Sequence, residues 1–255
     1  MEFCLSNFFS FSLSESMGSY LTLLNFRCQS LNFLIKIKRG RRSFADARHP
    51  EICVVMPDYI EFWFEFASTY SYLSAMRVET VAGDAGIYVV WRPFLLGPIF
   101  RKQGWDTSPF NLYPIKGEYM WRDAERHCGR YGIPFKKPTV FPRNSILAAR
   151  VACIAMSEGW CPEFSRSVFG ANFAEDRDIS SPEVITEILN SIKKDGHEYL
   201  SRIKLPEFKG LLREQTAKAM NLGIFGAPSF ISREELFWGN DRLEDAIQWY
   251  YEKGV

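Results

Sequence analysis

The stretch YIEFWFEFASTYSYLSA, residues 59–75, carries a strand pattern directly into a helix pattern. Large apolar residues occupy every second position, which predicts a strand with two distinct faces. One face carries Ile60, Phe62, Phe64 and Phe66, and the other carries Glu61, Trp63 and Glu65. The strand is expected to end at Ser68, because residues 70–86 repeat apolar side chains at helical spacing. Ser68 and Ser71 therefore place two hydroxyls, three residues apart, where a strand gives way to a helix.

A second strand is predicted at residues 87–96, IYVVWRPFLL. Strand, helix and strand in this order form a βαβ unit, so we expect two parallel strands with a right-handed crossover. Residues 97–115 are rich in Gly, Pro and aromatic residues and predict a long loop. Long ordered loops are usually functional.

The middle of the chain is predicted to be helical, in segments 116–132, 144–160, 161–175, 181–196 and 206–223. Asn144 or Ser145 is the predicted N-cap of the second, and Ser181 with Pro182 begins the fourth, which Gly196 is expected to end. Residues 226–232 and 235–239 then predict a β-hairpin. Residues 240–254 predict an amphipathic closing helix, with Asn240 or Asp241 at its N-cap.

Composition excludes some classes of protein. The 255 residues are 47% hydrophobic and 24% charged with a net charge of +1, so nothing indicates a nucleic-acid partner. No apolar run reaches the length of a membrane-spanning helix.

The histidines are far apart in sequence and no C-x-x-C occurs, so no metal site is predicted. The thiols are expected to be buried or incidental, as in a reducing compartment. The six cysteines are Cys4, Cys28, Cys53, Cys128, Cys153 and Cys161.

The first 56 residues differ from the rest, because they are rich in Ser, Phe and Leu and include the basic run KIKRGRR. Three explanations are open: an organelle transit segment, a peripheral amphipathic anchor, or upstream sequence translated in frame before a start at Met56. We favour the last, since MPDYIEFWF begins a domain cleanly. Residues 1–56 are therefore expected to be an extension outside the fold, poorly packed on the remainder.

The segment Ser68-Thr69-Tyr70-Ser71 lies where the predicted helix begins. Hydroxyls at both ends cannot form or exchange a disulfide, so dithiol chemistry is excluded at this position. A helix N-terminus offers unpaired N–H groups and a partial positive charge, which favour an anion such as a ligand's thiolate. Taken alone, S-x-x-S is more often an N-cap serine followed by a surface residue.

Several further motifs occur in one order along residues 57–253: FEFASTYSYL, RPFLLGPIF, GWDTSPFN, YPIKGEYMWRD, FPRNS, GIFGAPSF and WGNDRL. In this the chain resembles the 2-hydroxychromene-2-carboxylate isomerases and kappa-class glutathione transferases of the DsbA-like thioredoxin superfamily. The resemblance implies an α/β, thioredoxin-like fold (βαβ…ββα) with a large all-helical insertion. Residues 57–97 and 218–255 would form the thioredoxin-like domain, and residues 98–217 the loop and helical insertion.

The resemblance also implies glutathione as cofactor. Ser68 matches the serine that hydrogen-bonds the glutathione sulfur, and Ala227 matches the residue whose backbone pairs with the cysteinyl part, before a Pro228 expected to be cis. The stretch that holds the γ-glutamyl end matches Trp238, Gly239, Asn240 and Asp241. Relatives commonly carry Asn where this chain has Asp106. An amide can donate a hydrogen bond, but an ionised carboxylate only accepts one. The hydrogen bond that the Asn side chain would donate to glutathione is therefore in question here.

Substrate contacts are assigned less directly. Arg101 or Lys102 would neutralise a substrate carboxylate, Asn111 would lie nearby, and Arg143 with Asn144 would line the other wall. A solvated or capping role is an equal alternative for these side chains. Trp105 and Trp238 are expected near the ligand because they lie within site motifs.

The resemblance implies an isomerase that acts on 2-hydroxychromene-2-carboxylate or a similar small aromatic carboxylate. A glutathione thiolate would add to the conjugated system, allow rotation and leave again, with Ser68 lowering the pKa of the thiol. The alternatives are a glutathione transferase that conjugates electrophiles and a non-catalytic binding module on a thioredoxin scaffold. We expect a cytoplasmic protein, or an organellar one if residues 1–56 are a transit peptide, with a homodimer as an open alternative.

Overall fold

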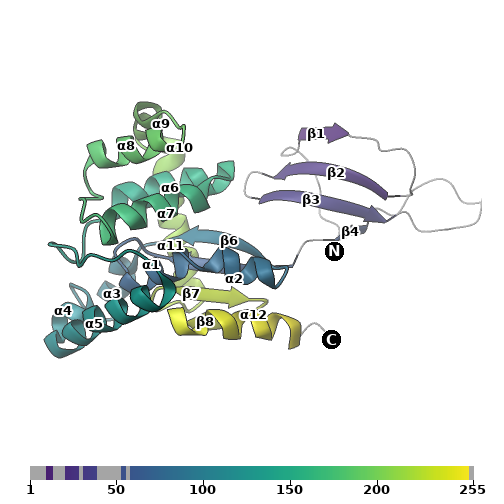
Figure 1. Ribbon diagram of the computed structural model, residues 1–255. Coiled ribbons are helices and arrows are strands. Elements are labelled where there is room, and N and C mark those ends of the chain that lie inside the picture. Colours follow the sequence, from purple (N-terminus) through teal and green to yellow (C-terminus); the bar gives the residue numbers. More distant parts are fainter. Residues whose placement is uncertain (1–9, 14–20, 29–30, 39–52, 56–57, 253–255) are drawn as a thin grey trace, which may run out of the picture. The chain divides into compact units, whose positions relative to one another are not determined.

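The structure is a computed structural model that describes residues 10–13, 21–28, 31–38, 53–55 and 58–252 (Figure 1). The chain divides into two compact units. The first comprises residues 1–58 and 157–159, and the second comprises residues 59–156 and 160–255.

The first unit contains a four-stranded sheet in the order β1-β2-β3-β4. All neighbouring strands are antiparallel. The strands are β1 (Ser10–Leu13), β2 (Leu21–Cys28), β3 (Leu31–Lys38) and β4 (Cys53–Val55). Much of the sequence-based hypothesis for residues 1–56 falls outside the described residues, and the separateness of this segment from the fold stays a prediction.

The second unit is built on a sheet with the strand order β6-β5-β7-β8. Its strands are β5 (Tyr59–Phe64), β6 (Tyr88–Pro93), β7 (Ser229–Ser232) and β8 (Glu235–Trp238). β5 pairs in parallel with β6, which confirms the βαβ unit. β7 pairs antiparallel with both β5 and β8, which confirms the hairpin and places it directly beside the first strand.

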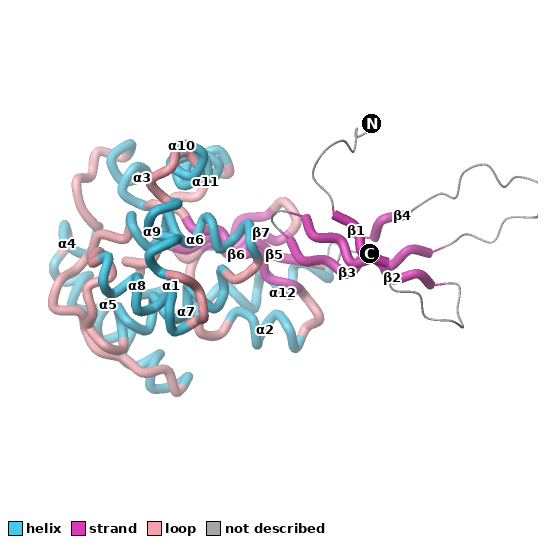
Figure 2. The backbone as a smooth tube through the Cα atoms, turned by 90° about the horizontal axis from the view of Figure 1, so that it is seen from above, coloured by secondary structure: helices cyan, strands magenta, loops and turns pink. Residues whose placement is uncertain are grey.

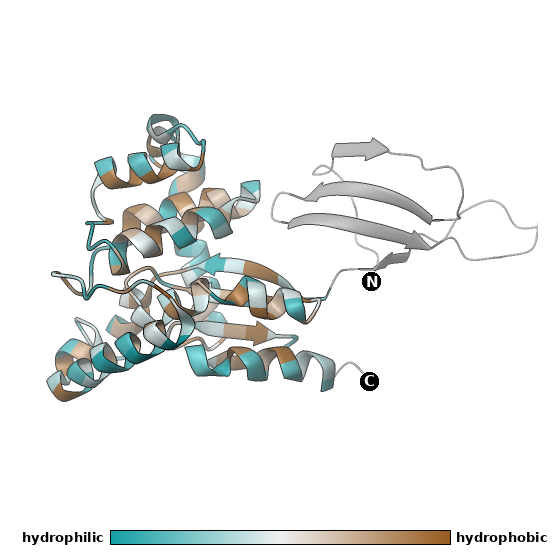
Figure 3. Ribbon diagram, in the orientation of Figure 1, coloured by the Kyte–Doolittle hydropathy of each residue, from teal (hydrophilic) through white to brown (hydrophobic). Residues whose placement is uncertain are grey.

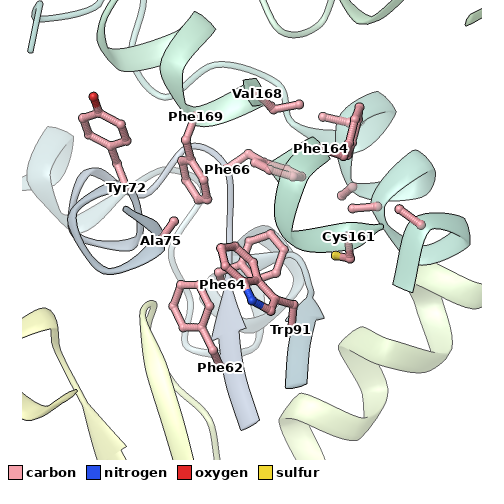
Figure 4. Close-up of a cluster of buried hydrophobic side chains, with 14 of the residues drawn as sticks. Phe62, Phe64, Phe66, Tyr72, Ala75, Trp91, Cys161, Phe164, Val168 and Phe169 are labelled. Atoms are coloured by element: carbon pink, nitrogen blue, oxygen red, sulfur yellow. The ribbon is translucent and has the colours of Figure 1, made fainter. Parts of the chain in front are cut away.

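Side chains on both faces of β5 are buried, and they alternate between two cores as its sequence predicts two distinct faces. Ile60, Phe62 and Phe64 belong to the larger core, with side chains from α1, α2, α7 and α12. In Figure 4, Phe62 and Phe64 lie edge-on against Trp91, and Phe66 lies against Phe169. Trp63 faces the opposite side and belongs to a smaller core with residues of α3 and α11. The sheet is therefore the middle layer of three.

The helices that follow β5 are shorter than the sequence predicts. The predicted helix over residues 70–86 is two helices, α1 (Thr69–Ala75) and α2 (Val78–Asp84). The break lies at Arg77, whose side chain contacts Asn240, Glu244 and the ring of Tyr131. These are tertiary contacts, which helical periodicity does not reveal.

The predicted loop over residues 97–115 is wrong in part, because it contains α3 (Leu96–Lys102) and α4 (Pro109–Leu112) and the start of α5. Pro98 and Pro109 lie in the first turns of these helices, where proline is tolerated since its missing N–H has no partner to lose. Ser108 caps α4 by accepting a hydrogen bond from the Phe110 N–H at 3.3 Å.

The helical block is confirmed, and in Figure 1 α6 to α9 lie together as a cluster beside the sheet. Gly196 begins a helix rather than ending one, since α8 ends at Ser191. The predicted helix over residues 206–223 is also divided, at Gly210. The helices are α5 (Pro114–Tyr131), α6 (Ile146–Glu158), α7 (Cys161–Phe173), α8 (Pro182–Ser191), α9 (Gly196–Arg202), α10 (Pro206–Lys209) and α11 (Leu211–Asn221).

The chain closes with a short 3-10 helix, η1 (Asn240–Arg242), and α12 (Leu243–Glu252) (Figure 2). Helix α5 is mostly hydrophilic along its length (Figure 3). It accordingly buries only a narrow stripe that includes Met120, Ala124 and Cys128. Of the helices in the described part of the chain, none combines the length and apolarity needed to cross a bilayer.

Candidate active site

Ser68 is the N-cap of α1, at the end of the central strand β5. Its Oγ accepts a hydrogen bond from the Ser71 N–H at 3.1 Å, which satisfies one of the free donors of the helix. The same Oγ donates to the carbonyl oxygen of Ala227 at 2.8 Å. Ser68 is only partly buried, so its hydroxyl remains accessible beside the positive end of the helix.

Ala227 and Pro228 lie directly before β7, and the peptide bond between them is cis, as predicted. The hydrogen bond from Ser68 joins two residues that are 159 positions apart in sequence. Pairing of β5 with β7 creates this contact, because Trp63 of β5 lies opposite Ser229. The start of the helix and the proline bend therefore face each other at one edge of the sheet.

Residues 238–241 form the corner after β8. Gly239 has a φ of 117°, which favours glycine over any side chain, and its N–H donates to the carbonyl of Pro228 at 3.0 Å. Trp238 is 54% exposed, and its indole crosses the ring of Phe225 with centroids 4.8 Å apart. The corner is thus joined by backbone to the proline bend and offers an exposed aromatic surface.

The side chains of Asn240 and Asp241 point to different partners. Asn240 is buried, and its Oδ1 accepts from Ser74 Oγ at 3.0 Å and from Arg77 Nη1 at 3.4 Å. Its amide oxygen therefore fixes η1 against α1. Asp241 is exposed, and its carboxylate pairs with Arg242 at 3.0 Å.

A cavity of about 1340 Å³ connects these features. It brings together residues that the sequence analysis assigned to glutathione and to substrate, and it includes both predicted tryptophans. Two assigned residues, Lys102 and Asn111, do not line it. The assigned residues in its wall are Ser68, Arg101, Asp106, Arg143, Asn144, Ala227, Pro228, Trp238, Gly239, Asn240 and Asp241.

Three of the residues assigned to substrate have structural partners. Arg143 is buried, donates a hydrogen bond to Asn172 Oδ1 at 3.0 Å and forms an ion pair with Asp176. Hydrogen bonds from the Thr139 N–H and from Arg143 hold the pKa of Asp176 below its usual range. Asn144 Oδ1 accepts the Ile146 N–H at the start of α6. Asn111 donates to the Phe141 carbonyl. Their role in substrate binding stays a prediction, and the structure shows the packing or capping alternative for each.

Glu65 is a cavity residue that the sequence analysis treated only as part of a strand. It is 7% exposed and lines the cavity close to the start of α1. Burial raises the pKa of its carboxyl to about 7, although hydrogen bonds from the Ser145 hydroxyl and the Ala67 N–H act in the opposite direction. The alternation along β5 indicates a buried position, but it does not reveal which partners the carboxyl finds.

A second group that sequence reasoning missed joins α1 to α5. Tyr70 donates through its hydroxyl to Asp123 Oδ2 at 3.1 Å, and burial together with Asp123 raises the pKa of Tyr70. His127 lies 3.6 Å from the same carboxylate, and its Nδ1 is buried without a hydrogen-bond partner. All three line the cavity. The i, i+4 spacing of Asp123 and His127 places them on one helix face, although nothing in the sequence relates that face to Ser68.

The cavity wall carries hydroxyl, carboxyl, imidazole and cationic side chains beside the start of α1. Among the described residues, no group of three or more His, Cys, Asp or Glu could hold a metal ion. The three cysteines with described side chains, Cys128, Cys153 and Cys161, are buried and free of disulfides, and none lines the cavity. The described part of the chain therefore offers this cavity no thiol of its own.

The family model that matches this chain lies within the residue range of the second unit. A family model described as "DSBA-like thioredoxin domain" matches residues 59–249. The chain is 28% identical over 191 residues to a 2-hydroxychromene-2-carboxylate isomerase from Pseudomonas putida, across 72% of this chain and 90% of that protein. It is 24% identical over 181 residues to glutathione S-transferase kappa 2 from Caenorhabditis elegans, across 66% and 78%.

The fold is also found among solved structures. A 2-hydroxychromene-2-carboxylate isomerase superposes with a TM-score of 0.66 at 25% sequence identity, covering 76% of this chain and 97% of that one. A probable DsbA oxidoreductase from Streptomyces coelicolor superposes with a TM-score of 0.62 at 17% identity. The second likeness concerns the fold alone.

Proposed function

This chain belongs to the DsbA-like thioredoxin domain family, and from that premise we propose that it is a glutathione-dependent isomerase. Its substrate is 2-hydroxychromene-2-carboxylate or a similar aromatic carboxylate, and Ser68 stabilises the glutathione thiolate. The relatives named 2-hydroxychromene-2-carboxylate isomerase support the reaction type. Because the sequence identity to these relatives is modest, the geometry of the cavity is the main support for the proposed function.

One observation carries the proposal: the Ser68 hydroxyl lies at the start of α1, 2.8 Å from the carbonyl of Ala227, in the wall of a large cavity. Without a ligand the hydroxyl and the carbonyl satisfy each other. An extended peptide at the cis-proline bend would give the carbonyl a backbone N–H instead and release the hydroxyl for a sulfur anion. The two groups thus exchange partners without leaving a buried donor unpaired.

The residues present fit glutathione. The Ala227–Pro228 bend suits the peptide backbone, and Ser68 with the helix end suits the sulfur. The exposed carboxylate of Asp241 suits the α-amino group, while Asn240 acts by holding η1 in place. Bound glutathione would supply a thiolate that adds reversibly to a conjugated double bond and so permits rotation.

The other residues of the site bind and orient the substrate. Arg101 is exposed on α3 and lines the cavity, which suits it to hold a substrate carboxylate. Phe100 and Trp105, with ring centroids 5.8 Å apart, give an aromatic surface next to it. Ser68 keeps the sulfur ionised by donating a hydrogen bond to it.

Isomerase activity of the purified protein, measured with and without glutathione, tests the proposal. We expect activity only with glutathione, and a large loss in Ser68→Ala. Calorimetry with glutathione separates this function from that of a non-catalytic module, for which no binding is expected. Activity that survives both the removal of glutathione and the Ser68→Ala change would remove the thiol from the mechanism.

A second candidate function is conjugation of glutathione to electrophiles, which the kappa-class relatives favour. The same site would serve, and the product would leave with the sulfur attached. Mass spectrometry after incubation with glutathione and an electrophilic aryl halide detects this outcome. Accumulation of conjugate, together with no turnover of the chromene carboxylate, would favour the transferase.

A further inference from the structure

Glu65 lies three residues before Ser68, and both residues line the same cavity. The two residues are linked through the backbone, because the Ser68 N–H donates to the Glu65 carbonyl at 3.0 Å. A buried acid therefore lies in the wall of the cavity where an anion would bind, and among the described residues no ion pair neutralises it.

The hydrogen bonds of Glu65 come from two neutral donors. Oε2 accepts the Ala67 N–H at 3.1 Å, and Oε1 accepts the hydroxyl of Ser145. No cation among the described residues forms an ion pair with it. Because an unpaired buried carboxylate is costly, a carboxyl in this setting exists partly in its protonated form.

Glu61 provides a contrast on the same strand face, four residues earlier. Its carboxylate is 2.7 Å from Arg92 Nη2 and 3.5 Å from Lys218 Nζ, and it also accepts from the Trp63 indole at 2.9 Å. Two cations therefore neutralise the buried acid within β5, whereas the buried acid directly after β5, at the cavity, pairs with no cation of the described residues. The difference points to a group that holds an exchangeable proton rather than one that only supports the fold.

We propose that Glu65 accepts the proton of the thiol that binds beside Ser68 and returns it when the thiol leaves. This inference rests on the proposed function. The S–H bond breaks and the electron pair stays on sulfur, while an O–H bond forms on the Glu65 carboxylate. The pair carries one negative charge before and after the transfer, so the site never holds two neighbouring anions.

Other titratable groups share the cavity but do not contact Glu65. Arg143 lies two residues before Ser145, the hydroxyl partner of Glu65, but its charge is neutralised by an ion pair with Asp176. Tyr70 is bonded to Asp123, which also lies beside His127. The remaining charged groups of the wall are Arg101 and Asp106 near α3, Lys116 on α5, and Asp241 with Arg242 at the corner.

The test counts protons released for each thiolate formed when glutathione binds. Calorimetry in buffers of different ionisation enthalpy gives the protons, and ultraviolet absorbance gives the thiolate. The pH is set above the pKa of Glu65, where the carboxylate is ionised before binding. We expect the wild type to form thiolate with almost no proton released, and Glu65→Gln either to release about one proton per thiolate or to form none.

S-Methylglutathione is the matched control, since it has no thiol proton, and it should bind both proteins without a difference in proton release. If Glu65→Gln does not fold, infrared difference spectra of the wild type answer the same question. A protonated carboxyl band should appear when glutathione binds and should be absent with S-methylglutathione. Release of about one proton per thiolate by the wild type, or no new carboxyl band, overturns this inference alone, whereas failure to bind glutathione overturns the proposed function as well.

Discussion

The cavity has two walls of different construction. The thioredoxin-like wall consists of Ser68, the Ala227–Pro228 bend and residues 238–241, and its contacts run through backbone atoms or short side chains. The insertion wall, drawn from residues 98–217, includes the exposed side chains of Arg101, Lys116 and Tyr119. One wall is fixed by strand pairing, and the other presents long side chains to solvent.

This difference separates two tasks. A wall fixed by backbone hydrogen bonds holds its groups in one geometry, which suits a cofactor that is always the same and a thiolate whose position matters. A wall of long, solvated side chains changes readily with sequence and suits the choice of substrate. Changes in the first wall should therefore affect the reaction itself, and changes in the second should affect substrate affinity.

The largest effect is expected from Ser68→Ala, because it removes the hydroxyl that we propose stabilises the glutathione thiolate. We expect kcat/KM for the glutathione-dependent isomerisation to fall about 1,000-fold, as on loss of one donor to a developing anion. Ser71→Ala is the matched control: the buried Ser71 Oγ has no partner, and the backbone N–H that caps onto Ser68 is kept. Equal losses in the two variants would show that the helix start, and not the hydroxyl, matters.

The next effect concerns stability, through the buried carboxyl of Glu65 in the cavity lining. Its pKa is about 7 in the folded protein against 4.5 in the reference state, so the folded state binds more protons between these values. The free energy of unfolding should therefore fall by about 3 kcal/mol as the pH rises through this window. Urea titrations at several pH values should show this fall in the wild type and not in Glu65→Gln. Parallel curves for the two proteins would contradict the burial of an ionisable group there.

Substitutions of two neighbouring cationic residues, Arg101 and Lys102, test the role of the insertion wall in substrate binding. Arg101 lines the cavity and Lys102 does not, although both lie in the last turn of α3. Arg101→Gln should raise KM for the carboxylate substrate about tenfold, the value of one charge-assisted hydrogen bond, and leave glutathione affinity unchanged. Lys102→Gln should change neither. A change in glutathione affinity in Arg101→Gln would mean that the two walls do not divide the work as described.

The smallest effect is expected from Asp106→Asn, an exposed residue of the cavity wall. An amide donates as well as accepts, so the change should tighten glutathione binding about threefold, within the range of a single solvent-exposed hydrogen bond. Calorimetry at one pH and salt concentration measures it. Weaker binding in the variant would show that the carboxylate of Asp106 is itself a contact.

The sequence by itself determined the secondary structure of the sheet and the chemical nature of its first loop. Alternation along residues 59–66 fixed which face Phe62 and Trp63 occupy, since successive strand residues point to opposite sides. The S-x-x-S segment offered an N-cap serine as one interpretation, which Ser68 shows, and the motif order indicated the family and, through it, the cis bond before Pro228. These features depend on short-range geometry or on motifs that the chain displays in order.

Only the tertiary structure decided which partners the polar side chains find. Arg143 resembles a substrate contact in sequence, yet Asp176 neutralises it; Glu61 and Glu65 look equivalent, yet one meets two cations and the other meets none. The predicted helix over residues 70–86 is interrupted at Arg77, whose side chain contacts residues near the other end of the chain. Charge and hydrogen-bond partners come from segments far apart in sequence, and their energies depend on burial and distance, which no local pattern encodes.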